Sequence, residues 1–129
     1  MSTKTVLVVD DEPHIRYILE SKLRGAGFAV LTASNGRDAY DLASAHLPDL
    51  VITDFQMPAS SGLELCARLT SNARTAGIPA IMLTARGHRI APSELARTNI
   101  HELLPKPFSV RQLLAKIAEL FGTQADVAA

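Results

Sequence analysis

Short runs of consecutive apolar residues, rich in β-branched side chains, recur along the chain. The three clearest runs are residues 5–9, 50–53 and 80–83, and none of them alternates between apolar and polar positions. Uninterrupted runs of this length are typical of strands that are covered on both faces, as in a parallel sheet. We therefore expect these three runs to form the centre of such a sheet.

Two weaker runs, residues 28–32 and 100–104, complete a set of five strands. The second of them contains His101 and Glu102 and is followed by Pro105. Charged side chains and proline are tolerated best at the edge of a sheet, because an edge strand has fewer backbone partners to satisfy. We therefore place the two weaker strands at the edges.

Four other stretches carry apolar residues at helical spacing, so that each forms one apolar face. These faces are Ile15, Ile18, Leu19, Leu23 and Ala26; Ala39, Leu42, Ala43 and Leu47; Leu65, Cys66, Leu69 and Ala73; and Val110, Leu113, Leu114, Ile117 and Phe121. Gly25 and Gly27 are expected to end the first helix, and Pro48 the second. Ser61 lies at the expected start of the third, and Ser109 is a candidate N-cap of the last.

The stretch after residue 84 is less regular. Pro92 suits the first position of a short helix, with Glu94 just inside it. The alternative is a longer helix that begins near His88 and is kinked at Pro92. We expect the short helix.

Strands and helices thus alternate five times along 129 residues. This alternation predicts an α/β fold, a doubly wound parallel sheet with helices on both faces and right-handed crossovers. With the most apolar strands in the middle, the expected strand order is 2-1-3-4-5, the flavodoxin-like (βα)5 arrangement. The length fits one domain, which we assign to residues 1–122, with residues 123–129 as a flexible C-terminal tail.

The composition narrows the class of protein. Thirteen basic and thirteen acidic side chains balance, so no strongly basic surface for nucleic acid or an anionic membrane is expected. The single cysteine, Cys66, has no partner for an internal disulfide and is expected in the core. No apolar stretch approaches the ~20 residues of a membrane span, and no signal peptide is apparent. We therefore expect a cytoplasmic protein.

Five polar residues stand at the ends of predicted strands: Asp10, Asp11, Asp54, Thr84 and Lys106. The carboxyl ends of parallel strands meet at one edge, and the crevice lies where the strand order reverses, between strands one and three. Three carboxylates there repel one another unless a cation joins them, and clustered hard oxygens suit Mg2+. An aspartate can act as a nucleophile toward phosphorus, while an amine and a hydroxyl stabilise the transferring group. The residues predict phosphoryl transfer to a carboxylate.

Four short motifs contain these residues. They are Val-Asp-Asp-Glu-Pro at 9–13, Thr-Asp-Phe-Gln-Met-Pro at 53–58, Leu-Thr-Ala at 83–85 and Leu-Pro-Lys-Pro-Phe at 104–108. Asp54 lies 44 positions after Asp10, Thr84 lies 30 after Asp54, and Lys106 lies 22 after Thr84. With this spacing the set resembles the receiver domain of bacterial two-component response regulators. The resemblance covers residues 4–121 and is nearest to stand-alone, chemotaxis-regulator-like receivers. Each motif alone is weak, but the ordered set is specific.

The resemblance implies a phosphorelay signal-transduction switch. A sensor histidine kinase or a phosphotransfer protein would deliver a phosphoryl group to Asp54, the phosphoacceptor. Mg2+ would be bound by Asp54, directly by Asp11, mainly through water by Asp10, and by the backbone carbonyl of Gln56. The chain would not be a conventional enzyme, although Mg2+-dependent self-phosphorylation and slow autodephosphorylation are expected.

The resemblance also implies roles on the last two strands. Thr84 and Lys106 would contact the phosphoryl oxygens, and the peptide bond from Lys106 to Pro107 would be cis. Leu103 stands where the family has an aromatic residue that turns inward on activation. Asn99 stands where the family usually has glycine, and because asparagine is the next-best residue for a left-handed cap, we expect this change to be benign.

Partners and output follow from the same resemblance. A downstream protein target would bind the face made by the fourth helix, the fifth strand and the fifth helix, without direct nucleic-acid contact or membrane insertion. Gln56 and Arg86 would flank the path of the attacking water. Arg86 could instead meet a partner or be a solvated loop arginine.

Other interpretations stay open at this point. A degenerate receiver would keep the fold without being phosphorylated, but its usual sign, loss of an acid or of the lysine, is absent here. A phosphohydrolase on the same scaffold would carry a second aspartate where this chain has Gln56. Asp10 and Asp11 could simply cap the first helix, which would leave Asp54 and Lys106 unexplained.

Overall fold

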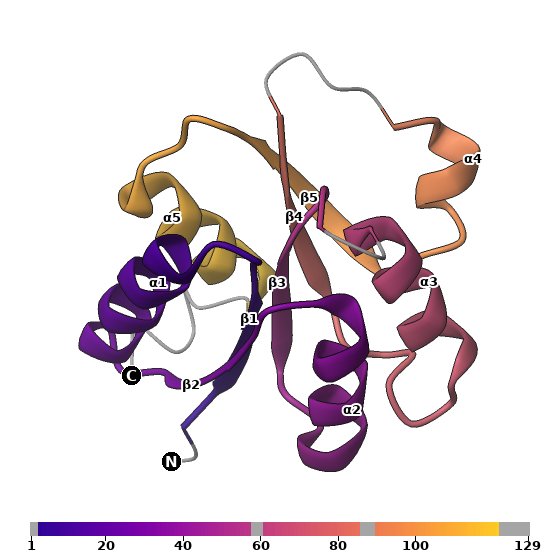
Figure 1. Ribbon diagram of the computed structural model, residues 1–129, viewed down its shortest axis with the longest axis horizontal. Coiled ribbons are helices and arrows are strands. Elements are labelled where there is room, and N and C mark those ends of the chain that lie inside the picture. Colours follow the sequence, from indigo (N-terminus) through magenta and orange to yellow (C-terminus); the bar gives the residue numbers. More distant parts are fainter. Residues whose placement is uncertain (1–2, 58–60, 86–89, 122–129) are drawn as a thin grey trace.

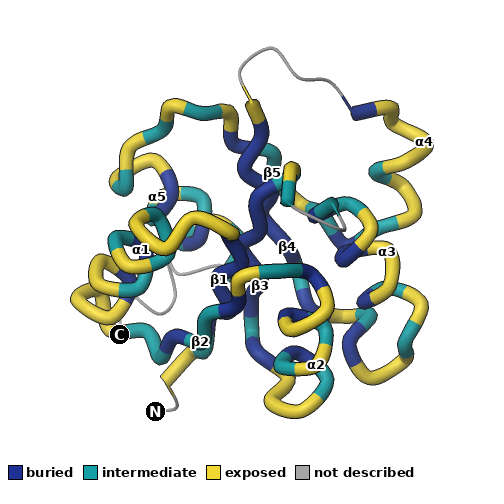
Figure 2. Tube along the Cα trace, viewed as in Figure 1, coloured by how far each residue is buried: buried dark blue, intermediate teal, exposed yellow. Residues whose placement is uncertain are grey.

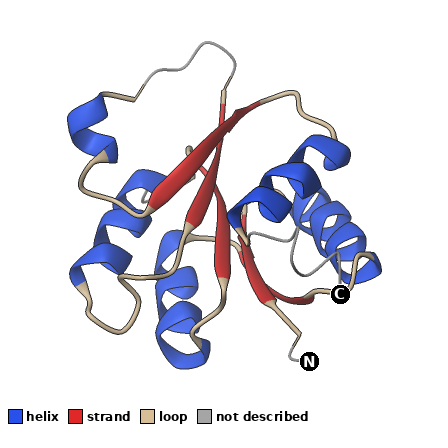
Figure 3. Ribbon diagram, turned by 180° about the vertical axis from the view of Figure 1, so that it is seen from behind, coloured by secondary structure: helices blue, strands red, loops and turns tan. Residues whose placement is uncertain are grey.

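The computed structural model describes residues 3–57, 61–85 and 90–121. Five strands form one parallel sheet in the order β2-β1-β3-β4-β5 (Figures 1 and 3). The strands are β1 Thr5–Val9, β2 Ala29–Ala33, β3 Leu50–Asp54, β4 Ala80–Thr84 and β5 Ile100–Pro105. The helices are α1 Pro13–Gly25, α2 Gly36–His46, α3 Gly62–Ser71, α4 Pro92–Leu95 and α5 Val110–Leu120. The predicted fold class, strand order and edge positions of β2 and β5 are confirmed.

Helices cover both faces of the sheet. Helices α1 and α5 lie on one side, and α2, α3 and α4 lie on the other (Figure 1). Strand β1 shows how alternation serves two cores: Val6 and Val8 belong to the cluster under α1 and α5, whereas Leu7 and Val9 belong to the cluster under α2 and α3. The central strands are therefore buried on both faces (Figure 2), which explains why they read as continuous apolar runs.

Cys66 lies in the second of these cores, as expected. Its side chain is fully buried on α3, and this burial raises the pKa of the thiol to about 12. The thiol therefore stays protonated at neutral pH and behaves as a small apolar side chain.

Two helices start with the same reciprocal cap. The Ser61 hydroxyl accepts from the Glu64 backbone N–H while the Glu64 carboxylate accepts from the Ser61 N–H. Ser109 and Gln112 form the equivalent pair at α5. Such a capping box satisfies two backbone donors that the helix itself leaves without partners. The predicted N-cap at Ser109 and the predicted start of α3 are confirmed.

Some boundaries differ from the sequence expectation. Strand β2 begins and ends one residue later than predicted, and α3 ends at Ser71, so Ala73 lies outside it. Helix α4 starts at Pro92, as expected, and has four residues. Ala91 before it has extended backbone angles, which excludes a helix that runs continuously through this position. His88 and the predicted tail, residues 123–129, lie outside the described residues.

The left-handed conformation considered for Asn99 is not found, whereas the expectation that asparagine is benign at this position stays a prediction. Among the described non-glycine residues, Leu47 alone has a positive φ, so Asn99 is not in the left-handed conformation. Its buried side-chain amide instead donates to the carbonyl of Ile78. Asn99 therefore ties the loop before β5 to the loop before β4, a long-range contact that has no local signature in the sequence.

No helix in the described part of the chain is both long enough and apolar enough to cross a membrane.

Candidate functional site

The carboxyl ends of four neighbouring strands carry the predicted site. Asp54 and Thr84 are the last residues of β3 and β4, while Asp10 and Lys106 directly follow β1 and β5. The register brings these ends to a common level, because Val9 pairs with Thr53 and Asp54 with Leu83. The strand order therefore gathers residues that are up to 96 positions apart in the sequence, as the difference between 106 and 10 shows.

Three carboxylates meet at this edge. One oxygen each from Asp10, Asp11 and Asp54 lies within 4.8 Å of the others. Asp10 is fully buried, Asp54 is 8% exposed, and Asp11 is exposed. Three anions at this spacing repel one another in a partly dry setting, and a small hard cation would relieve the repulsion.

The unfavourable setting is clearest at the Asp10 carboxylate. Its Oδ1 accepts from the Glu12 backbone N–H at 2.9 Å, but its buried Oδ2 has no hydrogen-bond partner. Burial raises the pKa of the Asp10 carboxyl, and the charge of Asp54 raises it further, against the lowering effect of the Glu12 N–H. The interpretation of Asp10 and Asp11 as helix caps is wrong, since the N-cap of α1 is Glu12, which makes no side-chain cap.

Lys106 forms an ion pair with Asp54. Its Nζ lies 2.9 Å from Asp54 Oδ1. Burial alone would lower the pKa of Lys106, but the hydrogen bond to Asp54 and the charges of Asp54 and Asp10 outweigh it, so the pKa is raised. Its backbone N–H donates to the Thr84 carbonyl at 2.7 Å, and the peptide bond to Pro107 is cis, as expected. Lys106 thus places a cation next to Asp54. Its backbone is hydrogen-bonded to Thr84, the last residue of β4.

Gly62 touches the backbone of Asp54, a role that sequence reasoning missed. A Cβ at this first residue of α3 would lie 2.3 Å from the Asp54 carbonyl oxygen and 3.0 Å from Thr53 Oγ1. The Gly62 N–H donates to the Phe55 carbonyl at 2.8 Å, and the Thr53 hydroxyl donates to the Asp54 carbonyl at 3.0 Å. The sequence signalled a helix start here, but the close approach depends on tertiary packing.

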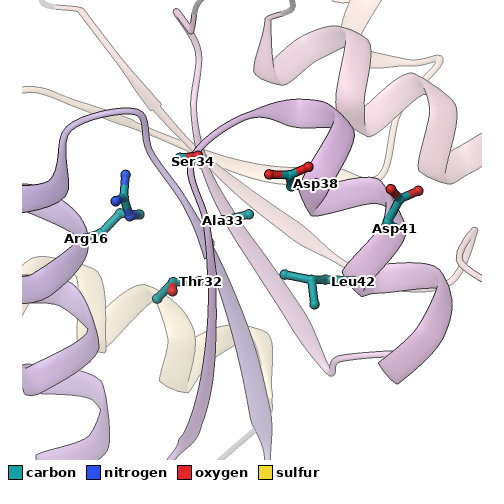
Figure 4. A pocket seen from close by; sticks show the side chains of 7 residues that line it. All are labelled: Arg16, Thr32, Ala33, Ser34, Asp38, Asp41 and Leu42. Atoms are coloured by element: carbon teal, nitrogen blue, oxygen red, sulfur yellow. The ribbon is translucent and has the colours of Figure 1, made fainter.

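Arg16 is the second residue that the sequence did not single out. Its guanidinium Nη1 donates to the Asp10 backbone carbonyl at 2.8 Å. Arg16 lies on the α1 side of a pocket whose α2 side carries Asp38 and Asp41, with Ser34 between them at the end of β2 (Figure 4). An arginine on the partly exposed face of a helix is too common to predict such a contact.

The remaining predicted residues are only partly placed. Gln56 is exposed in the loop two residues after Asp54, and its carbonyl ligand role stays a prediction. Leu103 is half-buried and packs against the core under α2 and α3. Arg86 lies outside the described residues.

Comparison with known proteins gives a consistent family. The family model described as "Response regulator receiver domain" matches residues 6–118. The phosphate regulon transcriptional regulatory protein PhoB of Pseudomonas aeruginosa is 38% identical over 117 residues, which is 91% of this chain and 51% of PhoB. The probable transcriptional regulator ycf27 of Guillardia theta is 41% identical over 115 residues, 87% of this chain and 43% of the relative. The chain thus spans about half the length of these curated relatives.

Solved structures agree with this comparison. A response regulator from Chloroflexus aurantiacus described as putative matches with a TM-score of 0.85 and 32% identity, covering 94% of this chain and 99% of the other. The response regulator TrrA of Thermotoga maritima, solved in complex with Mg(2+)-BeF, matches with a TM-score of 0.80 and 34% identity, over 92% and 99% of the two chains.

Proposed function

This chain belongs to the response regulator receiver family, the signal-transduction switches of two-component systems, and we propose that Asp54 is the residue that accepts the phosphoryl group. The observation that carries the proposal is the setting of Asp54. It is one of the three clustered carboxylates and is also paired with Lys106 at 2.9 Å. Asp10 and Asp11 have no such cationic partner among the described residues.

We propose Asp10, Asp11 and Asp54 as the ligands of Mg2+, with the Gln56 carbonyl as a fourth. Two observations support a cation here: three carboxylate oxygens converge within 4.8 Å, and the buried Oδ2 of Asp10 lacks a partner. Hard oxygen donors with room for water and phosphate suit Mg2+ better than softer metals. When bound, Mg2+ would neutralise charge that develops on the phosphoryl oxygens.

The residues then divide the work of transfer. An Asp54 carboxylate oxygen forms a bond to phosphorus while the bond from phosphorus to the donor atom breaks, and the electron pair of that bond stays with the donor. The Lys106 ammonium and the Thr84 hydroxyl contact the phosphoryl oxygens, so that charge is stabilised where it develops. Later attack by water on phosphorus restores the Asp54 carboxylate and releases phosphate, which makes the chain a timed switch rather than a conventional enzyme.

The partners are part of the proposal. We infer a histidine kinase or phosphotransfer protein as donor and a protein target that binds the face formed by α4, β5 and α5. The relatives named as transcriptional regulators match this chain over only about half their length, so DNA contact is not assigned to this domain. The cytoplasmic location expected from the sequence belongs to the same proposal.

Phosphorylation with a small acyl phosphate and Mg2+ tests the assignment. Intact-mass measurement should show the gain of one phosphoryl group on the wild type and on Asp41→Asn, an exposed aspartate on α2, but none on Asp54→Asn. Circular dichroism should show that Asp54→Asn keeps its fold. Labelling of Asp54→Asn would refute the acceptor. An unlabelled wild type, in conditions that label another receiver, would favour the degenerate receiver, and steady turnover of a phosphate ester would favour the phosphohydrolase.

A further inference from the structure

Asp10 is held at three of its four polar atoms. Its backbone N–H donates to the Ala33 carbonyl at 3.1 Å, its carbonyl accepts from Arg16 Nη1 at 2.8 Å, and its Oδ1 accepts from the Glu12 N–H at 2.9 Å. Only Oδ2, which is buried, lacks a hydrogen-bond partner, and the Asp10 carboxylate has an oxygen within 4.8 Å of oxygens of Asp11 and Asp54. The residue is therefore locked in an orientation that leaves one oxygen for a ligand.

Arg16 supplies a bond that the sheet does not. The bond from Asp10 to Ala33 lies at the end of the β1–β2 ladder, because β2 ends at Ala33 and the chain turns into α2 after Asn35. The next carbonyl along, that of Asp10, is bound by a side chain instead. A buried carbonyl without a donor would cost free energy. Without this bond the Asp10 backbone would also be less restrained, and the side-chain carboxylate on the same Cα would move with it.

The Asp10 carbonyl is the hydrogen-bond acceptor found for the Arg16 guanidinium in the described part of the chain. Within the described ranges, Arg16 forms no ion pair with a carboxylate, although Asp38 and Asp41 line the opposite side of its pocket (Figure 4). Arg16 lies in the first turns of α1, and its own N–H donates to the Glu12 carbonyl at 3.1 Å. One short segment therefore holds Asp10 twice, through the Glu12 N–H on the carboxylate and through Arg16 on the backbone.

We propose that Arg16 is a positioning residue for the metal site: its hydrogen bond to the Asp10 carbonyl aims Asp10 Oδ2 at the cation. This inference rests on the proposed function, in which Asp10 helps to bind Mg2+. Arg16 acts through Asp10 and is not itself a ligand, since a guanidinium donates hydrogen bonds and has no lone pair for a metal. Positioning partners of metal ligands typically change affinity by about 10- to 100-fold when removed.

The sign of the effect separates positioning from simple charge. Arg16 is a cation near a proposed cation site, so by Coulomb repulsion alone its removal should tighten Mg2+ binding. Loss of positioning has the opposite effect, because Asp10 Oδ2 would no longer be held toward the ion. A purely structural role would lower the melting temperature without changing the affinity of the folded protein.

Arg24 offers a matched control on the same helix. Its guanidinium Nη2 donates to the Val30 carbonyl at 3.0 Å, so it too ties α1 to the backbone of the sheet. Val30 lies near the start of β2, at the end of the sheet away from the carboxylate cluster. Arg24→Met therefore removes the same charge and the same kind of bond, together with the exposed ion pair to Glu20 at 3.1 Å, without touching Asp10.

The test is Mg2+ titration by calorimetry, well below the melting temperature, on the wild type, Arg16→Met, Arg16→Lys and Arg24→Met. We expect Arg16→Met to weaken binding about tenfold or more, Arg16→Lys to recover part of the loss, and Arg24→Met to stay within about twofold of the wild type. Amide exchange of Glu12 in the metal-free protein should quicken in Arg16→Met relative to that of core amides in the same sample, which is a readout that does not depend on the metal.

Arg16→Met binding Mg2+ as tightly as the wild type, or more tightly, would overturn the proposal. An equal loss in Arg24→Met would also overturn it, because the effect would then follow from the loss of charge or of helix anchoring. A wild type that binds no Mg2+ would refute the metal site of the proposed function, and this inference with it. That result differs from the first, in which the wild type binds and Arg16 alone proves unimportant.

Discussion

Lys106 Nζ lies 2.9 Å from Asp54 Oδ1, so the proposed acceptor is paired with a cation of the chain itself. The pair joins the ends of β3 and β5, two strands that are separated in the sheet by β4. The same cation that supports Asp54 competes with a metal for it, and this competition has measurable consequences.

Lys106→Met should separate metal binding from phosphoryl transfer. Removing a positive charge beside the cluster should tighten Mg2+ about tenfold, because two cations no longer share Asp54. Phosphorylation by a small acyl phosphate should slow by about 10²-fold or more, since a group that stabilises the transferring phosphoryl is lost. Calorimetry and intact-mass time courses measure the two effects, and weaker Mg2+ binding in the variant would argue against the competition.

The ion pair should also give a defined pH dependence of stability. The pKa of Lys106 is raised in the folded state, so the pair stabilises the protein fully below the unfolded value of 10.5 and loses this effect as pH rises through the folded value. Because the lysine side chain is 34% exposed, we expect a contribution of no more than about 1 kcal/mol. The difference in unfolding free energy between wild type and Lys106→Met should be flat from pH 7 to about 10 and shrink above that range.

Asp10→Asn should stabilise the metal-free protein. The pKa of Asp10 is raised by burial and by Asp54, so the folded state favours the neutral carboxyl. The neutral carboxyl contributes its full stability below pH 3.8, the unfolded pKa, and this contribution is lost as the pH rises through the folded pKa. At neutral pH an amide avoids this cost and can still accept from the Glu12 N–H. We expect a gain of about 0.5–2 kcal/mol in urea unfolding.

Mg2+ supplies the control for Asp10→Asn. Added Mg2+ should raise the stability of the wild type more than that of the variant, because binding to the native state alone stabilises it. Asp11→Asn, at an exposed position, should gain less in the metal-free state. A destabilised Asp10→Asn would mean that the buried carboxylate is not under strain.

Gly62→Ala should disturb the acceptor from behind. The new Cβ would lie 2.3 Å from the Asp54 carbonyl oxygen, so either α3 or the end of β3 must shift. We expect a loss of about 1–3 kcal/mol in stability, together with slower phosphorylation of Asp54. Gly25→Ala is the matched control: apart from its chain neighbours and the backbone of its own helix, no heavy atom lies within 4 Å of the added Cβ, and a gain of about 0.4–1 kcal/mol is expected in the last turn of α1. Equal effects at the two glycines would exclude a special role for Gly62.

Leu47→Asn should stabilise the fold at a position far from the site. Leu47 ends α2 with φ 49° and ψ 64°, a left-handed conformation that costs a branched-chain residue about 1–2 kcal/mol. Its side chain is 43% exposed, so little packing is lost on replacement, and asparagine tolerates the conformation. We expect about 0.5–1 kcal/mol by thermal or urea unfolding. Asn99→Gly should be destabilising instead, because position 99 does not have a positive φ and glycine lacks the side chain that donates to the Ile78 carbonyl.

Those two residues mark where sequence reasoning ends. Asparagine is a good left-handed residue and leucine is a poor one, so the sequence pointed to Asn99 for a positive φ and gave no hint of Leu47. The structure reverses the assignment, because tertiary contacts decide each backbone: the Asn99 side chain is drawn to Ile78, and Leu47 closes α2 before Pro48.

The order of apolar and polar residues was enough to predict the fold and the residues that share one edge of the sheet. Apolar runs without alternation can only be buried on both faces, so β1, β3 and β4 had to be central, and parallel strands then bring Asp10, Asp54 and Thr84 to one edge. How those residues are held in place depends on tertiary packing. The bond from Arg16 to the Asp10 carbonyl and the approach of Gly62 to the Asp54 carbonyl join a side chain or a missing side chain to a distant backbone atom. Such contacts depend on how closely two elements pack, and neither residue type nor sequence spacing predicts the distance between packed elements.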